Sequence, residues 1–211
     1  MRPVLCLVTD RRLCTRPLED VVADAVAGGV DWVQVRERDL DARALLALVR
    51  RVQAAARTAA AARGDGERVR VLVNRRVDVA LAAGADGVHL GWDALPPDEA
   101  RRLLGPRAIV GAATHGAEEV NGLRESGVDY VQLAPVFDPR SKPATRTPLG
   151  LACLRRATAY GLPVLAQGGV DETNAGAVLE AGAAGVAVTG AILQHADPTR
   201  AARALRAALT R

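Results

Sequence analysis

Two glycine-containing turns late in the chain have the residue types of a phosphate-binding site. Gly168 and Gly169 follow one apolar run, and Thr189 and Gly190 follow the next. Glycine lets the backbone approach a ligand closely, and a helix beginning just beyond offers free N–H groups and the positive end of its dipole. The pair therefore predicts a phosphate cup. The alternative for each turn is a tight strand-to-helix connection without a ligand.

A second candidate is the motif Gln34-Val35-Arg36-Glu37-Arg38. In an extended chain successive side chains alternate, so Gln34, Arg36 and Arg38 face one side. Two guanidinium groups on one face repel each other unless an anion or a buried carboxylate lies between them, and their forked donors match phosphate or carboxylate. We expect an anion here, with a structural salt bridge of Arg36 as the alternative.

His115, Asn74 and Lys142 complete the candidate set. His115 lies between a strand-like run and an acidic helix start, where an imidazole can act as general acid or base near neutral pH or can simply cap the helix. Lys142 is the only lysine and lies in a proline-rich loop typical of a lid. His89, inside an apolar strand, is expected to be structural. We predict no metal centre, because no His, Cys and carboxylate set has zinc spacing.

The elements that must position these residues alternate regularly along the chain. Strands are expected at 4–8, 30–35, 69–73, 87–90, 108–110, 130–133, 163–166 and 185–188, and helices at 18–27, 42–63, 77–83, from 96, 117–125, 149–160, 172–181 and 198–209. Strict alternation implies parallel strands joined by right-handed crossovers. We expect one (β/α)8 TIM barrel over 1–211, with its site at the carboxyl ends of the strands.

An open doubly wound sheet is the alternative architecture. Asp10-Arg11-Arg12 stands after the first strand, however, where a dinucleotide-binding sheet would carry a glycine-rich turn. Eight units also close into a barrel more readily than they extend an open sheet.

Composition limits the partners. The chain has 211 residues, 49% hydrophobic and 2% aromatic, so its core is built from aliphatic side chains. The net charge of +4 is spread over helix faces among acidic residues, which argues against nucleic-acid binding. No apolar run has the length of a membrane span, and Cys6, Cys14 and Cys153 are scattered, so we expect a cytoplasmic protein with reduced thiols. A homodimer is left open.

The motifs together resemble a known superfamily. The Gln34 to Arg38 motif and the runs 73–81, 86–91, 134–137, 167–169 and 185–188 are similar, in the same order, to thiamine-phosphate synthases and thiazole tautomerases. The resemblance implies a (β/α)8 barrel that binds a small phosphorylated thiazole, with its phosphate at the two glycine turns.

The resemblance divides at the positions that hold magnesium in the synthases. Arg75 stands where their first carboxylate falls, and Ala94 stands at the second, beside Asp93. An arginine opposes cation binding at that place. Gln34, Arg36, Asn74 and Lys142 still match the synthases, whereas the tautomerases lack the carboxylates and have a histidine aligned with His115.

We therefore expect a metal-independent thiazole tautomerase, an aromatising isomerase. His115 would be its general acid/base, and Arg36 the second catalytic residue. The substrate-binding residues would be Gln34, Arg38, Asn74, Lys142, Gly168, Gly169, Thr189 and Gly190. The second hypothesis is a divergent thiamine-phosphate synthase that joins hydroxymethylpyrimidine diphosphate to thiazole phosphate and uses Mg²⁺. The third is a non-catalytic phosphate-binding barrel.

Overall fold

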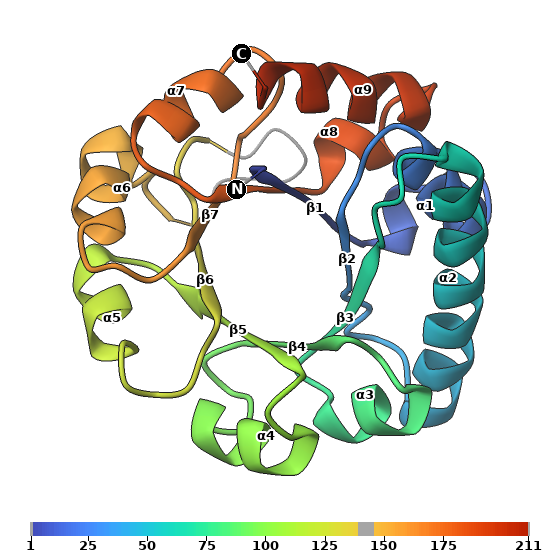
Figure 1. The fold of residues 1–211 in the computed structure, drawn as a ribbon, viewed down its shortest axis with the longest axis horizontal. Helices are drawn as coiled ribbons and strands as arrows, with labels where there is room; N and C mark the ends of the chain where they lie inside the picture. The colour runs from blue at the N-terminus through green and yellow to red at the C-terminus, as the bar shows by residue number, and fades with distance from the viewer. Residues whose placement is uncertain (1, 139–145, 211) are drawn as a thin grey trace.

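Eight parallel strands form a closed barrel surrounded by helices in the computed structural model, which describes residues 2–138 and 146–210 (Figure 1). Each strand pairs with the next along the chain, and β8 pairs with β1 to close the barrel. The expected (β/α)8 fold is confirmed. The carboxyl ends of all eight strands consequently meet at one mouth.

The strands are β1 (Val4–Val8), β2 (Trp32–Val35), β3 (Arg70–Asn74), β4 (Gly87–Leu90), β5 (Ile109–Thr114), β6 (Tyr130–Leu133), β7 (Val164–Gln167) and β8 (Gly185–Val188). The helices are η1 (Arg11–Leu13), α1 (Leu18–Ala27), α2 (Ala42–Arg63), α3 (Val77–Ala83), α4 (Pro97–Leu104), α5 (Ala117–Gly122), α6 (Gly150–Thr158), α7 (Ala175–Glu180), α8 (Gly190–Leu193) and α9 (Pro198–Ala208).

Strand β5 is longer than its sequence predicts. It continues beyond Val110 through Gly111-Ala112-Ala113, small residues that have little intrinsic preference for strands, to Thr114. Tertiary packing explains them, because a Cβ at Gly111 would lie 2.1 Å from the ring of Tyr130 on β6. The sequence analysis also missed η1 and the single-turn helix α8, and it placed the start of α7 three residues too early.

The apolar core has two parts. Most buried Val, Leu and Ala side chains lie between the sheet and the helices. A smaller cluster includes Cys6, Leu72, Tyr130 and Leu165. The ring of Trp32 meets Tyr130 edge-on, with ring centroids 5.0 Å apart. Burial raises the pKa of the Cys6 thiol to about 12, so this cysteine is a neutral packing residue at physiological pH.

Three aspartates lock neighbouring strands together at their amino ends, opposite the mouth. Each directly precedes or begins an even-numbered strand, and its carboxylate accepts the backbone N–H of the preceding strand. The pairs are Leu5 with Asp31 (2.8 Å), Val71 with Asp86 (2.9 Å) and Val110 with Asp129 (2.7 Å). Each carboxylate also pairs with an arginine: Arg206 with Asp31, Arg68 with Asp86 and Arg101 with Asp129. Charge-assisted bonds of this kind are stronger than neutral ones.

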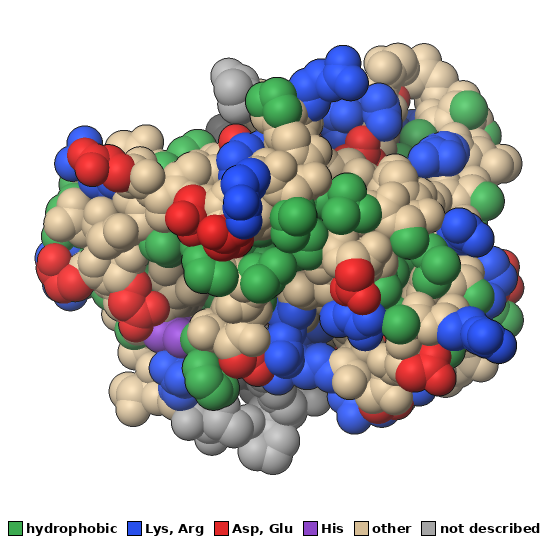
Figure 2. All heavy atoms as spheres, turned by 90° about the horizontal axis from the view of Figure 1, so that it is seen from below, with side chains coloured by type: hydrophobic (Ala, Val, Ile, Leu, Met, Phe, Trp, Pro, Cys, Tyr) green, Lys and Arg blue, Asp and Glu red, His purple; other side chains and the backbone are tan. Residues whose placement is uncertain are grey.

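Figure 2 looks onto the side of the barrel where α3 and α4 lie, and it shows acidic and basic side chains interspersed with apolar ones. Leu81 and Leu103 of these helices are each half exposed. Within the described residues, no helix combines the length and the apolar character needed to cross a membrane.

Candidate active site

A cavity of about 670 Å³ opens at the carboxyl ends of the barrel strands. It brings together nine of the ten residues that the sequence analysis selected, from strands β2, β3 and β5 and from both glycine turns. They are Gln34, Arg36, Arg38, Asn74, His115, Gly168, Gly169, Thr189 and Gly190. Lys142 lies outside the described residues. Segments far apart in the sequence thus meet in one place, as closure of the barrel requires.

Gln34 is the most deeply buried polar group of the cavity. It lies in β2, it has no solvent exposure, and neither its amide nitrogen nor its amide oxygen has a hydrogen-bond partner among the described residues. A buried amide left unpaired destabilises a fold by roughly 1–3 kcal/mol. The Gln34 side chain therefore has an NH2 donor group and a carbonyl acceptor available to a ligand in the cavity.

Arg36 and Arg38 line the cavity from the chain just beyond β2. The guanidinium of neither residue has a carboxylate within 4.0 Å in the described part of the chain, so the salt-bridge alternative for Arg36 is not supported. Burial, and then the positive charge of Arg38, lower the pKa of Arg36 from its ordinary value. This repulsion within the cavity favours an anionic ligand, which would relieve it.

The chain beyond β2 is fixed by a buried carboxylate that faces the other way. Glu37 is 5% exposed and accepts hydrogen bonds from the Thr9 hydroxyl (2.7 Å) and from the Arg11 backbone N–H (3.0 Å). The Thr9 hydroxyl also accepts the backbone N–H of Arg36 at 2.9 Å. The alternation expected for this motif is therefore present, and Glu37 helps to position the arginines.

The two histidines near the cavity differ in their bonding. The Nδ1 atom of His115 lies 2.7 Å from the carbonyl oxygen of Ala134, so it carries the proton and leaves Nε2 available. His89 is 3% exposed, and its Nδ1 lies 3.1 Å from the Tyr130 hydroxyl. Burial, and then Arg36, lower the pKa of His89 to about 3. His89 is a neutral, bonded strand residue, as expected.

The turn after β7 needs glycine for steric reasons. Gly168 and Gly169 have φ values of 91° and 63°. A Cβ at Gly168 would lie 2.7 Å from the Cα of Pro135, and one at Gly169 would lie 2.4 Å from the carbonyl oxygen of Asp138. Within the described residues, the backbone N–H groups of Gly169 and Gly190 donate no hydrogen bond. The turn after β7 is thus a tight connection in which the Gly169 N–H has no acceptor among the described residues.

The sequence analysis missed several polar residues that line the cavity. Gln132 on β6 is 2% exposed, and its amide nitrogen lies 4.0 Å from the Cys6 sulfur. A glutamine inside the apolar strand Tyr130–Leu133 was the available signal, because strand interiors rarely hold an amide without a reason. Gln167, Arg146 and Gln194 also line the cavity. Gln167 ends β7 directly before the Gly168-Gly169 turn, which was the available signal for it, whereas the sequence around Arg146 and Gln194 carries no such signal.

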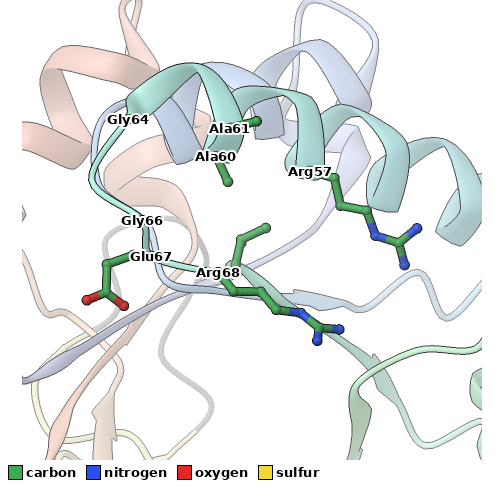
Figure 3. A pocket seen from close by; sticks show the side chains of 8 residues that line it. Arg57, Ala60, Ala61, Gly64, Gly66, Glu67 and Arg68 are labelled. Atoms are coloured by element: carbon green, nitrogen blue, oxygen red, sulfur yellow. The ribbon is translucent and has the colours of Figure 1, made fainter.

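A second hollow lies at the far end of the barrel, between the end of α2 and the chain leading into β3 (Figure 3). It has a volume of about 440 Å³ and is open to solvent. Glu67 points to one side of it in Figure 3, and Arg57 and Arg68 point to the other. The polar groups do not converge, so this hollow lacks the features of a binding site.

Comparison with known proteins places the chain in a family. The profile of the thiamine monophosphate synthase family matches residues 5–192. The chain belongs to this family. It is 41% identical to a thiamine-phosphate synthase of Roseiflexus castenholzii, over 97% of this chain and 87% of the relative. It is 46% identical to one of Anaeromyxobacter dehalogenans, over 87% and 79% of the two chains.

The fold agrees with a solved structure of the family. Thiamine phosphate pyrophosphorylase from Pyrococcus furiosus superposes with a TM-score of 0.85 and 31% identity, over 98% of this chain and 95% of that one.

These relatives correct the expected activity. The tautomerase, or isomerase, expectation is wrong, because the relatives at 41% and 46% identity over most of the chain are named synthases, which are transferases. The expectation rested on Arg75 and Ala94 at the metal positions and on the histidine aligned with His115. In the structure the guanidinium of Arg75 lies 2.6 Å from the carboxylate of Asp93. This local ion pair balances the charge, so an arginine at position 75 does not by itself indicate a different reaction.

The magnesium ion that the synthase resemblance implies does not fit the donors that this chain offers. Mg²⁺ prefers octahedral oxygen coordination. Position 75 carries a guanidinium, position 94 a methyl group, and Asp93 is already paired with Arg75. Among the described residues, no group of three His, Cys, Asp or Glu side chains could hold a metal ion.

Proposed function

We propose that this protein is a thiamine-phosphate synthase, a transferase that joins a hydroxymethylpyrimidine diphosphate to a thiazole phosphate. The observation that carries the proposal is the similarity to synthases over nearly the whole chain. The cavity supports it independently, because it combines unpaired guanidinium groups, a buried amide and two glycine turns. Two phosphorylated substrates need two anion-binding regions, and the arginines after β2 and the glycine turns after β7 and β8 are the two candidates.

The cavity residues divide between the two substrates by their chemistry. Arg36 and Arg38 suit the diphosphate, because a guanidinium binds phosphate oxygens in a bidentate manner. The free N–H groups of the turns at Gly168-Gly169 and Thr189-Gly190 suit the thiazole phosphate. The amide of Gln34, which offers an NH2 donor group and a carbonyl acceptor, matches the edge of an aminopyrimidine, and Asn74 lies near it on β3.

The reaction forms one bond and breaks one. The thiazole ring nitrogen attacks the methylene carbon of the pyrimidine with its lone pair. The bond from this carbon to the diphosphate oxygen breaks, and its electron pair leaves with the diphosphate. No proton has to move in this step, so His115 acts in our proposal as a hydrogen-bonding group to substrate. The protein accelerates the step by holding the two reactants together and by stabilising the departing negative charge.

A coupling assay with both phosphorylated halves tests the proposal. We expect thiamine phosphate and inorganic diphosphate to form in equal amounts, at a rate that Arg36→Gln lowers strongly. Arg57→Gln, in the far hollow, is the matched control and should react as the wild type does. Binding of both halves without any product would instead support a non-catalytic phosphate-binding barrel, and no binding would reject both.

A further inference from the structure

Arg75 does not itself line the cavity, but it lies beside the lining residue Gly91 and has an unusual backbone conformation. It directly follows β3, and its φ of 65° lies in the left-handed region, which costs a residue with a Cβ free energy. The backbone N–H of Arg75 donates to the carbonyl oxygen of His89 at 2.8 Å, which fixes this conformation. Its side chain runs past Gly91, a cavity-lining residue whose added Cβ would lie 3.8 Å from the Cγ and Cδ atoms of Arg75.

The guanidinium of Arg75 retains donors for a ligand. One of its nitrogens lies 2.6 Å from a carboxylate oxygen of Asp93, and the side chain is 32% exposed. Among the described residues, Asp93 is the one carboxylate within 4.0 Å of this guanidinium. A guanidinium has five N–H donors, so the ion pair with Asp93 holds the group in place and leaves most donors free.

Three carboxylates near the mouth are paired with arginines, and two others, Asp171 and Glu172, line the cavity after β7, where Asp171 accepts hydrogen bonds from the backbone and hydroxyl of Thr173. Asp10 pairs with Arg12 at 2.8 Å, and Glu37 pairs with Arg11 at 3.0 Å. Asp93 pairs with Arg75 itself. Among the described residues, no three His, Cys, Asp or Glu side chains are arranged to hold a metal ion, and neither Arg36 nor Arg38 has a carboxylate within 4.0 Å. The charge arrangement is suited to binding a multivalent anion directly.

We propose that the guanidinium of Arg75, held by Asp93, binds the diphosphate of the pyrimidine substrate and takes the place of a protein-bound divalent cation. This inference rests on the proposed synthase function. When the bond from carbon to oxygen breaks, the electron pair remains on the diphosphate. Arg75, Arg36 and Arg38 together stabilise that charge. The step then needs neither a metal ligand from the chain nor a proton.

Binding of inorganic diphosphate tests the role of Arg75 apart from catalysis. Calorimetric titration of the full chain in EDTA should give binding that Arg75→Gln weakens roughly 10- to 100-fold, as expected for loss of hydrogen bonds to a charged group. Arg57→Gln is the matched control and should bind as the wild type does. Wild-type protein should give no bound Mn²⁺ signal in electron paramagnetic resonance, whereas the double variant Arg75→Asp with Ala94→Asp should gain one.

The coupling assay separates this inference from the proposed function. We expect coupling in EDTA at a rate close to that in Mg²⁺, and a loss of coupling in Arg75→Gln. Coupling that requires Mg²⁺, with diphosphate binding that also requires it, would overturn the inference and leave the synthase function standing. If no condition gives coupling while Arg75→Gln still weakens diphosphate binding in EDTA, the proposed synthase function is rejected and the proposed diphosphate binding by Arg75 is retained. Equal binding by wild type and Arg75→Gln rejects the site.

Discussion

At the scale of single residues, two buried glutamines show how the cavity differs from the rest of the molecule. Gln53 on α2 is 4% exposed, and its amide donates to the carbonyl of Gly84 at 3.3 Å. Gln34 is fully buried, with both amide atoms unpaired among the described residues. The first glutamine contributes to packing. The second keeps an unfavourable free energy that a ligand relieves, which is common at binding sites.

Gln34→Leu should therefore separate stability from function. We expect the free energy of unfolding in urea to stay level or rise by about 1 kcal/mol, because an unpaired buried amide is removed. Coupling should fall about tenfold or more, since the substrate loses its hydrogen-bond partner. Gln53→Leu is the matched control, expected to lose about 1 kcal/mol of stability and no activity. A destabilised Gln34→Leu protein with normal kinetics would refute this assignment.

Most cavity residues could be found from the sequence because alternation and strand ends are visible there. Gln34, Arg36 and Arg38 follow from the alternation of one extended segment. The ion pair between Arg75 and Asp93 could not be found, because it depends on how the segments after β3 and β4 meet. Without this ion pair in view, the positive charge of Arg75 favoured the tautomerase expectation.

At the scale of elements, the turn after β7 packs against the segment after β6. Glycine at positions 168 and 169 permits this close contact, and the neighbouring backbone leaves no room for a methyl group. Figure 1 shows β6 and β7 side by side in the barrel wall, as their pairing requires. The local sequence predicts a turn after β7. The need for glycine at both positions becomes clear only from the contact with the segment after β6, which belongs to another part of the barrel.

Gly169→Ala should damage both the fold and the site. Its φ of 63° and the 2.4 Å approach to the Asp138 carbonyl predict a loss of about 2 kcal/mol or more in unfolding free energy. Binding of thiazole phosphate should weaken as the turn shifts. Gly176→Ala is the comparison, because it lies within α7 with open space around it, and it should gain about 0.5–1 kcal/mol. If both variants behave alike in denaturant titration, the packing argument fails.

Strand and helix positions were predicted well where periodicity is strong. The bounds of β1, α1 and α2 agree with the structure residue for residue. The end of β5 was missed, because Gly111 is there to accommodate Tyr130, a contact with another strand. The single turn α8 was missed because four residues are too few to display a helical period.

At the scale of the whole molecule, the buried His89 makes stability depend on pH. Its pKa is about 3 in the folded chain and near the ordinary value of 6.5 in the unfolded one. Between these values the unfolded chain binds a proton that the folded chain does not. Stability is therefore fully present above pH 6.5 and falls as the pH decreases toward 3.

Urea titrations at several pH values should reveal this effect. We expect His89 to contribute a loss of up to about 1.4 kcal/mol per pH unit below pH 6.5. His89→Gln, which keeps a group able to bond the Tyr130 hydroxyl, should have a shallower slope by about this amount. His89→Asn serves as a second variant. Identical slopes in the wild type and both variants would show that the histidine is not kept neutral by the fold.

The three aspartate locks allow the two ends of the barrel to evolve separately. Asp31, Asp86 and Asp129 fasten the strands at the end away from the mouth. Because these bonds lie at the opposite end, a mutation at the mouth does not remove them. Residues at the mouth can therefore change while the strands stay joined at their amino ends. The residues that hold the strands together at their amino ends and the residues that line the mouth are thus different residues, and each set can be mutated without changing the other.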